Sequence, residues 1–183
     1  MSETEVNPPP RFDRASLEKA GFEGFVPLLT LDSGTVPTAP GVYCVVRVSV
    51  DPPSFLATSP AGRFKGKDPT VSSGRLEAKW IRDTPVLYIG KASDRRGSQG
   101  ALRKRLDEYR RHGVGQPVGH WGGRFIWQLE DAAELLICWR TSKEVEAEDV
   151  EAAMLAAFVA NYGGLPFANL KRGRRGTSAG IAH

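Results

Sequence analysis

The sequence predicts an α+β protein, with strands and helices sharing one core. Three short apolar segments, residues 41–50, 86–90 and 134–139, are typical of strands. Two longer segments, residues 101–113 and 142–164, have the apolar spacing or the strong helix formers of helices. The chain has 183 residues, which lies within the usual size of one domain, about 100 to 200 residues. We therefore expect one main domain.

The N-terminal segment is polar and rich in proline, as the stretch MSETEVNPPP shows. Such a composition is typical of a tail without regular structure. Residues 16–20 can open a short helix with Ser16 as its N-cap, before Pro27 interrupts it. We expect residues 1–35 to form a tail and a short helix, and residues 36–172 to form the domain.

The first strand is predicted at residues 41–50, GVYCVVRVSV, after a stretch punctuated by Pro and Gly. From residue 51 to about residue 80 the chain is rich in Pro, Gly and Ser, so we expect an insertion at 51–80. Loops of this length are uncommon in compact domains and usually carry function or disorder. The basic stretch GRFKGK within it contains Lys65 and Lys67, which suit contact with a phosphate backbone.

The second strand, VLYIG at residues 86–90, is followed by a polar loop and then by a helix. In residues 101–113, Leu102, Leu106 and Tyr109 recur on one face, and Gly113 supplies a C-terminal stop. The Gly-rich stretch GVGQPVGHWGGR then leads through FIWQL at residues 125–129 to the strand ELLICW at 134–139. The last helix, residues 142–164, has Ser142 as its predicted N-cap. Residues 173–183 are expected to form a basic, flexible tail.

Composition excludes several classes of protein. The chain is 40% hydrophobic and 25% charged, as globular proteins are. No segment approaches the roughly 18 apolar residues of a membrane span, and the N-terminus lacks the order of a secretory signal. We therefore expect a cytoplasmic protein with no membrane partner. Cys44 and Cys138 lie in apolar runs without the spacing of zinc ligands, which predicts reduced core thiols.

The formal net charge is only +4, but basic residues are concentrated between Lys91 and Arg111. Phosphate-backbone binding uses such concentrations. On charge alone, a nucleic-acid surface and a solvated helix face are equally favoured.

Four motifs in succession point to a family. They are GVY at residues 41–43, YIGK at 88–91, LRKRLDEY at 102–109, and a helix with Glu151, Met154 and Leu155 that is followed by PFAN at 166–169. From about residue 40 to 170, this arrangement resembles the GIY-YIG endonuclease family. The resemblance implies an αβ sandwich with a three-stranded, mainly antiparallel central sheet flanked by helices. It also implies a metal-dependent endonuclease that hydrolyses phosphodiester bonds, with double-stranded DNA as the expected partner. The alternative is a nucleic-acid-binding module of the same fold with little or no activity.

By this resemblance, seven residues are the candidate catalytic set: Tyr43, Tyr88, Lys91, Arg105, Tyr109, Glu151 and Asn169. Arg105 offers a planar donor fork for a phosphate, and Lys91 offers a point charge. Glu151 would hold one Mg²⁺ or Mn²⁺ together with waters. Either strand tyrosine could accept a proton from the attacking water if nearby positive charge lowers its pKa. Asn169 would brace the site through hydrogen bonds.

The residue types leave several alternatives open. Arg103 or Lys104 could take the place of Arg105. Glu148, which lies one helical turn earlier, could take the place of Glu151. His120 could position water or phosphate, or it could be hydrogen-bonded structurally beside Trp121 and Trp127. The two strand tyrosines could also be ordinary core aromatics. The candidate nucleic-acid contacts are Lys65, Lys67, Arg95, Arg96, Arg103, Lys104 and His120.

Overall fold

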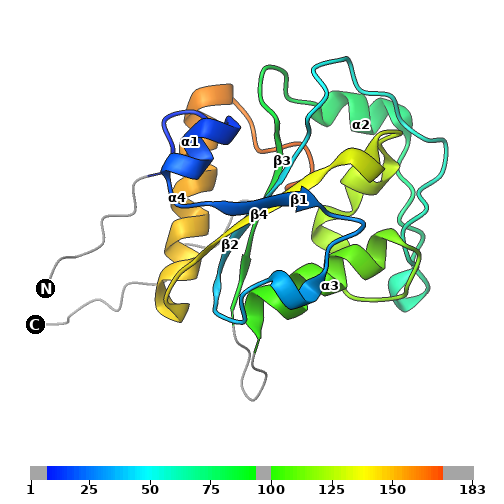
Figure 1. Ribbon diagram of the computed structural model, residues 1–183. Coiled ribbons are helices and arrows are strands. Elements are labelled where there is room, and N and C mark those ends of the chain that lie inside the picture. The colour runs from blue at the N-terminus through cyan, green and yellow to red at the C-terminus, as the bar shows by residue number, and fades with distance from the viewer. Residues whose placement is uncertain (1–7, 94–99, 171–183) are drawn as a thin grey trace, which may run out of the picture.

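The computed structural model describes residues 8–93 and 100–170. It contains one sheet with helices on both faces (Figure 1). The helices are α1 (Arg14–Lys19), α2 (Ser73–Lys79), α3 (Ala101–Gly113) and α4 (Glu144–Tyr162). The strands are β1 (Glu23–Pro27), β2 (Gly41–Val46), β3 (Val86–Ala92) and β4 (Leu136–Thr141). Short 3₁₀ turns are η1 (Ser33–Thr35), η2 (Phe64–Gly66), η3 (Trp121–Gln128) and η4 (Ala132–Glu134).

The sheet has four strands in the order β1-β4-β2-β3, and every neighbouring pair is antiparallel. The predicted α+β class is confirmed, but the predicted count of three strands is wrong. The additional strand, β1, lies within residues 1–35 and pairs with β4 along the outer edge. It lacks regular alternation because Gly24 and Phe25 have positive φ angles of 97° and 51° at a break in register. A strand bent in this way gives little periodic signal.

Each face of the sheet is covered by its own apolar core. The core beneath α3 and η3 includes Tyr43, Tyr88, Leu106 and Trp127. The core beneath α1 and α4 includes Leu17, Cys44, Ile89 and Met154. The central strand β2 is buried along its whole length, which explains its unbroken apolar sequence. Cys44 and Cys138 are free, buried thiols on adjacent strands, as their apolar surroundings predict.

Element boundaries differ from the sequence predictions where polar side chains make contacts that spacing does not show. Helix α1 begins earlier than residue 16, because the Asp13 carboxylate accepts a hydrogen bond from the Ser16 amide at 2.8 Å. Strand β2 ends at Val46, and the Arg47 guanidinium next to it pairs with Asp131 at 2.6 Å. Helix α4 is capped by Lys143 instead of Ser142. Helix α3 matches the predicted residues 101–113.

The insertion at residues 51–80 is packed against the domain. It contains α2 and η2, and Phe55 forms an isolated antiparallel bridge with Leu129. The Gln128 amide donates to the carbonyls of Leu56 and Val71 and accepts from the Val71 amide. Within the described ranges, no helix has both the length and the apolar character needed to cross a membrane.

Candidate active site

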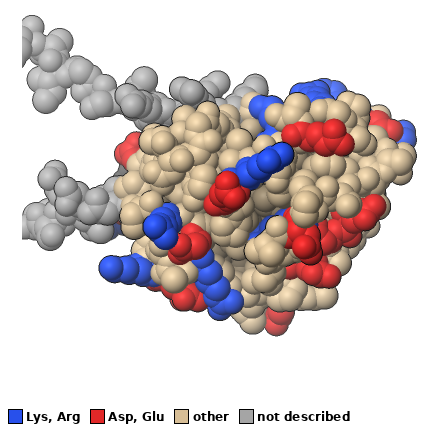
Figure 2. All heavy atoms as spheres, turned by 90° about the horizontal axis from the view of Figure 1, so that it is seen from above, with Lys and Arg blue, Asp and Glu red and all other residues tan. Residues whose placement is uncertain are grey.

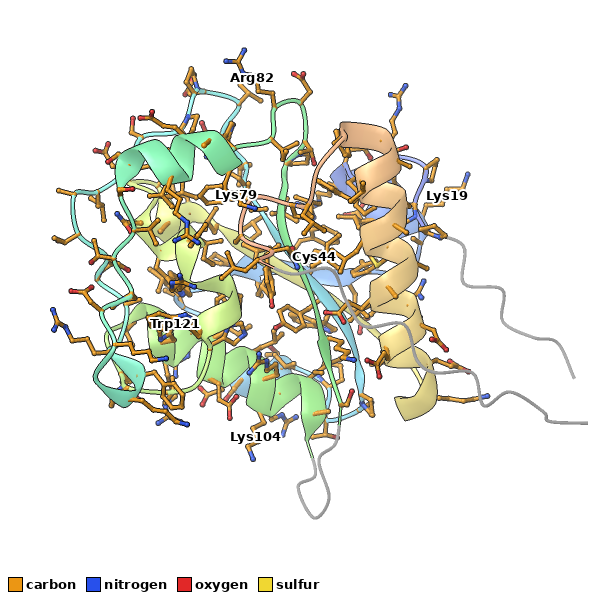
Figure 3. All side chains as sticks on the ribbon, turned by 180° about the vertical axis from the view of Figure 1, so that it is seen from behind. Lys19, Cys44, Lys79, Arg82, Lys104 and Trp121 are labelled. Atoms are coloured by element: carbon orange, nitrogen blue, oxygen red, sulfur yellow. The ribbon has the colours of Figure 1, made fainter. Side chains whose placement is uncertain are left out.

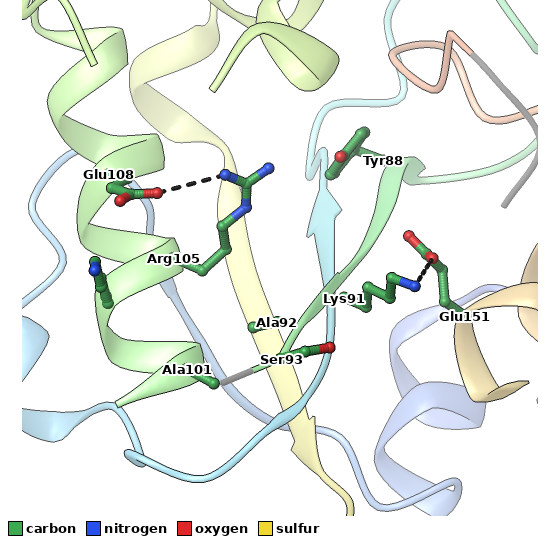
Figure 4. Close-up of a pocket in the computed structure, with 9 residues that line it drawn as sticks. Tyr88, Lys91, Ala92, Ser93, Ala101, Arg105, Glu108 and Glu151 are labelled. Atoms are coloured by element: carbon green, nitrogen blue, oxygen red, sulfur yellow. Dashed lines mark hydrogen bonds and ion pairs between the residues drawn. The ribbon is translucent and has the colours of Figure 1, made fainter. Parts of the chain in front are cut away.

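A pocket of about 330 Å³ lies at the free edge of β3 (Figure 4). Its lining combines β3, the first half of α3 and one side chain of α4: Tyr88, Lys91, Ala92, Ser93, Ala101, Lys104, Arg105, Glu108 and Glu151. Because β3 is an edge strand, side chains from both faces of the sheet can meet around it. Tyr88 belongs to the α3 face, whereas Lys91 is paired with side chains of α4. The edge position thus joins two otherwise separate layers in one site.

The two strand tyrosines lie side by side. In the antiparallel register Tyr43 is opposite Gly90 and Val45 is opposite Tyr88, so both tyrosines are on the same face. Their ring centroids are 5.9 Å apart. A Cβ at position 90 would lie 2.7 Å from Cζ of Tyr43 and 2.7 Å from Cε1 of Tyr88. Glycine at this position is what leaves room for both rings.

Tyr109 and His120 complete an aromatic cluster behind the pocket. The Tyr109 ring stacks on the His120 ring with centroids 3.6 Å apart and planes 2° apart. The Tyr109 hydroxyl donates to the Gly123 carbonyl at 2.8 Å, and the Tyr43 hydroxyl lies 3.1 Å from Nε2 of His120. Tyr43, Tyr109 and His120 are fully buried, while Tyr88 lines the pocket. Neither Tyr109 nor His120 lines the pocket, and the contact with Tyr43 fits the structural alternative for His120.

The charge of Arg105 acts on both strand tyrosines. Its Nη1 atom donates to the Gly119 carbonyl at 3.2 Å and lies 3.4 Å from Oε2 of Glu108. Burial raises the pKa of both Tyr43 and Tyr88, and the charge of Arg105 opposes that rise. Both phenols stay protonated near neutral pH unless more positive charge approaches. A divalent cation bound in the pocket would supply such charge.

The alternative helix residues have other contacts. Arg103 donates through Nε to the Val36 carbonyl and through Nη2 to the Gly34 carbonyl, which ties α3 to η1. Lys104 is exposed and lines the pocket, and Figure 3 shows it pointing outward from α3. Arg105, whose charge bears on both tyrosines, therefore remains the candidate fork.

Glu151 and Lys91 form the opposite wall of the pocket. Nζ of Lys91 lies 2.6 Å from Oε1 of Glu148 and 3.9 Å from Oε2 of Glu151. The Glu151 side chain is 13% exposed and the Glu148 side chain is 38% exposed. Burial raises the pKa of Glu151, and the Lys91 ammonium opposes the rise. Of the two carboxylates, Glu151 is the one inside the pocket.

The pocket could bind a divalent cation through one or two carboxylates, with water as the remaining ligands. Among residues 8–93 and 100–170, no three His, Cys, Asp or Glu side chains gather as a metal cluster. Mg²⁺ is often bound by one or two carboxylates and several waters, and Glu151 supplies one such carboxylate in the pocket. Glu108, on the facing wall, was not singled out from sequence, and neither was Ser93.

The remaining predicted nucleic-acid contacts lie away from the pocket wall or outside the described residues. Lys65 and Lys67 are exposed in and beside η2, and they do not line the pocket. The Phe64 ring of this turn lies close to Gly119, where a Cβ would be 3.4 Å from its Cζ. Arg95 and Arg96, like residues 173–183, lie outside the described residues.

Charge on one further face of the molecule is mixed in sign. On the face in Figure 2, Lys and Arg side chains alternate with Asp and Glu, and the basic side chains gather into no single patch. The pocket, in contrast, is lined by Lys91, Lys104 and Arg105 together with two carboxylates.

Asn169 fixes the edge strand beside the pocket. Its Oδ1 accepts from the Ile89 amide at 2.9 Å, and its Nδ2 donates to the Ile89 carbonyl at 2.8 Å. These are the backbone groups that β3 turns away from β2. Asn169 thus closes the free edge one residue from Tyr88, and it acts on the site through the backbone.

Replacing Asn169 with alanine should lower the free energy of unfolding by about 2 to 4 kcal/mol, because it leaves two buried backbone groups of Ile89 unpaired. Denaturant titration followed by tryptophan fluorescence measures the loss. Asn161→Ala is the matched control, since the exposed Asn161 amide makes one bond to the Pro10 carbonyl. We expect the control to change stability by less than about 0.5 kcal/mol. Equal effects of the two substitutions would contradict the bracing role.

Comparisons of this chain with protein-family models, with curated proteins and with solved structures find no match. Function therefore has to be inferred from the geometry of the pocket and from the motifs of the sequence.

Proposed function

We propose that this protein is a metal-dependent endonuclease of the GIY-YIG type that hydrolyses phosphodiester bonds of nucleic acid, with double-stranded DNA as its substrate. The observation that carries the proposal is that Tyr88, Arg105 and Glu151 line one open pocket. They come from a strand and from helices on opposite faces of the sheet. A structural core does not require a phenol, a guanidinium and a carboxylate to line one solvent-accessible pocket.

Arg105 and Lys91 supply the positive charge that phosphodiester cleavage needs. Negative charge grows on the phosphoryl oxygens during attack, and donors already held in place stabilise it without reorganisation. The Arg105 guanidinium is anchored by the Gly119 carbonyl through Nη1, so its planar fork keeps a fixed direction toward the pocket. Lys91 is held between Glu148 and Glu151, from where its ammonium can turn to a phosphate oxygen.

Tyr88 is the tyrosine in direct contact with the pocket, with Tyr43 immediately behind it. A phenol in this position can orient the attacking water. It would take the water's proton only as the phenolate, which the charges of Arg105 and of a bound cation would favour. Glu151 would hold the metal ion, Mg²⁺ or Mn²⁺. When bound, such an ion acidifies water and neutralises phosphate charge. Burial of Glu151 in the wall keeps its carboxylate directed into the pocket.

Cleavage by the wild-type protein is the primary test. Purified protein should nick supercoiled plasmid in the presence of Mg²⁺ or Mn²⁺, and EDTA should stop the reaction. Labelled double-stranded DNA, single-stranded DNA and RNA of one sequence then compare substrates under the same conditions. Salt-sensitive binding without cleavage at any tested metal concentration would contradict the endonuclease and favour a binding module of the same fold. Absence of both binding and cleavage would contradict both functions.

A further inference from the structure

His120 occupies the centre of the aromatic cluster, although the pocket does not expose it. Its ring has a stacking partner on α3, Tyr109, and a hydrogen-bonding partner on β2, Tyr43. It also lies within 6.2 Å of the Tyr88 ring, measured between ring centroids. A single loop histidine therefore touches or approaches the tyrosines of three separate elements.

We propose that His120 is a positioning residue of the nuclease site, which fixes the hydroxyl of Tyr43 behind Tyr88 and thereby sets the tyrosine pair in its active arrangement. This inference rests on the proposed function and assigns a role that the sequence left open between phosphate contact and simple packing.

Three contacts fix the orientation of the imidazole. The parallel stack on Tyr109 sets the plane of the ring, and the bond from the Tyr109 hydroxyl to Gly123 fixes Tyr109 itself. Arg105 holds the Gly119 carbonyl, which immediately precedes His120 in the chain. Within this frame, Nε2 faces the Tyr43 hydroxyl at 3.1 Å.

The consequence for Tyr43 is a fixed hydroxyl. A neutral imidazole can accept a hydrogen bond at Nε2 in one tautomer and donate one in the other. In the first tautomer the Tyr43 O–H points at the imidazole, and in the second a lone pair of the Tyr43 oxygen faces Nε2–H. Both tautomers hold the Tyr43 oxygen in place beside His120. Burial and the charge of Arg105 hold the pKa of His120 well below its usual value, so the ring is uncharged near neutral pH.

The decisive variant is His120→Phe, which keeps an aromatic ring for the stack and removes Nε2. We expect kcat for DNA cleavage to fall by roughly 10-fold or more while KM stays constant, since small misplacements of catalytic groups are costly. His120→Gln, whose side-chain amide can hydrogen-bond to the Tyr43 hydroxyl at a similar reach, should recover part of the rate. His112→Phe is the matched control, because His112 is equally buried and its ring nitrogens have no hydrogen-bond partner among the described residues. It should leave kcat near the wild-type value.

A double-mutant cycle separates positioning from packing. Tyr43→Phe removes the same hydrogen bond from the other side, and Tyr43→Phe combined with His120→Phe should be no slower than Tyr43→Phe alone. Additive losses would overturn the inference, because His120 would then act independently of the Tyr43 hydroxyl. If His120→Phe does not fold, a Tyr43→Phe protein with the wild-type kcat overturns it equally. If the wild-type protein cleaves nothing, the proposed function is overturned. If the wild-type protein and folded His120→Phe cleave at the same rate, only the role of His120 is overturned.

Discussion

Replacing Glu151 with glutamine should slow metal-dependent DNA cleavage by roughly 100-fold or more and leave DNA binding in place. The substitution keeps the size and the polar character of a side chain that is mostly buried in the pocket wall. It removes the negative charge that would hold a divalent cation. Charge stabilisation by a metal ion contributes several kcal/mol to such reactions, so kcat should fall by roughly 100- to 1000-fold. Single-turnover cleavage of a labelled duplex measures the rate, and a gel-shift assay in Ca²⁺ measures binding.

Two further carboxylates provide matched controls for this substitution. Glu148 pairs with the same lysine but lies outside the pocket, and Glu108 lines the pocket beside Arg105. Glu148→Gln and Glu108→Gln should each keep cleavage within about 10-fold of the wild type, because neither removes the proposed metal ligand. Loss of activity in Glu108→Gln with retention in Glu151→Gln would place the metal ion on the Glu108 side of the pocket. That result would contradict the proposed role of Glu151.

Local sequence predicts a helix or a strand well where an apolar spacing repeats several times within one segment. Helix α3 was predicted to its observed ends because Leu102, Leu106 and Tyr109 recur at helical spacing and Gly113 stops the helix. Strand β1 has five residues and a break in register at Gly24 and Val26, so no such repetition exists. Its stability comes from pairing with β4, and β4 is more than a hundred residues later in the sequence. Contacts of that kind are not contained in a local pattern.

The candidate site was predictable in its membership but not in its layout. The motif order selected Tyr88, Arg105 and Glu151, which the structure brings into one pocket. It did not predict that Tyr109 would be buried with its hydroxyl committed to Gly123. Nor did it resolve the role of His120, because the Gly-rich loop around it has no periodicity to orient a side chain. The clue in the sequence was composition alone, since Gly119 precedes the histidine and Gly122 and Gly123 follow Trp121, and glycines allow close approach.

The free edge of β3 explains how such distant residues can cooperate. A central strand would keep the face of Tyr88 and the face of Lys91 apart, because neighbouring strands would block both sides. At the edge, the backbone of Ile89 is paired with Asn169 instead of with another strand. The Asn169 side chain thus satisfies both the amide and the carbonyl of Ile89. Because no further strand covers this edge, side chains from both faces of β3 can reach the same pocket. We expect substitutions that loosen this edge to affect activity before they affect the distant core.

Arg105→Lys should reduce kcat by about 100-fold or more, the loss typical of removing one fixed donor to a developing oxyanion. Lysine keeps the positive charge but cannot hold the Gly119 carbonyl and present a planar fork to a phosphate together. DNA affinity should change little, because Lys91 and Lys104 still line the pocket. Stopped-flow or quenched-flow cleavage assays give kcat, and a binding titration at fixed salt gives the affinity.

The matched control is Arg111→Lys on the same helix, where the guanidinium pairs with Asp107 and donates to Gln116 outside the pocket. It should cleave at nearly the wild-type rate. If Arg105→Lys weakens binding as much as it slows cleavage, Arg105 serves the ground state and the transition state equally. If instead Arg105→Lys cleaves at the wild-type rate, charge alone suffices, and the fixed fork anchored by Gly119 has no catalytic role. Only a selective loss of kcat supports Arg105 as the donor that acts when the phosphate is attacked.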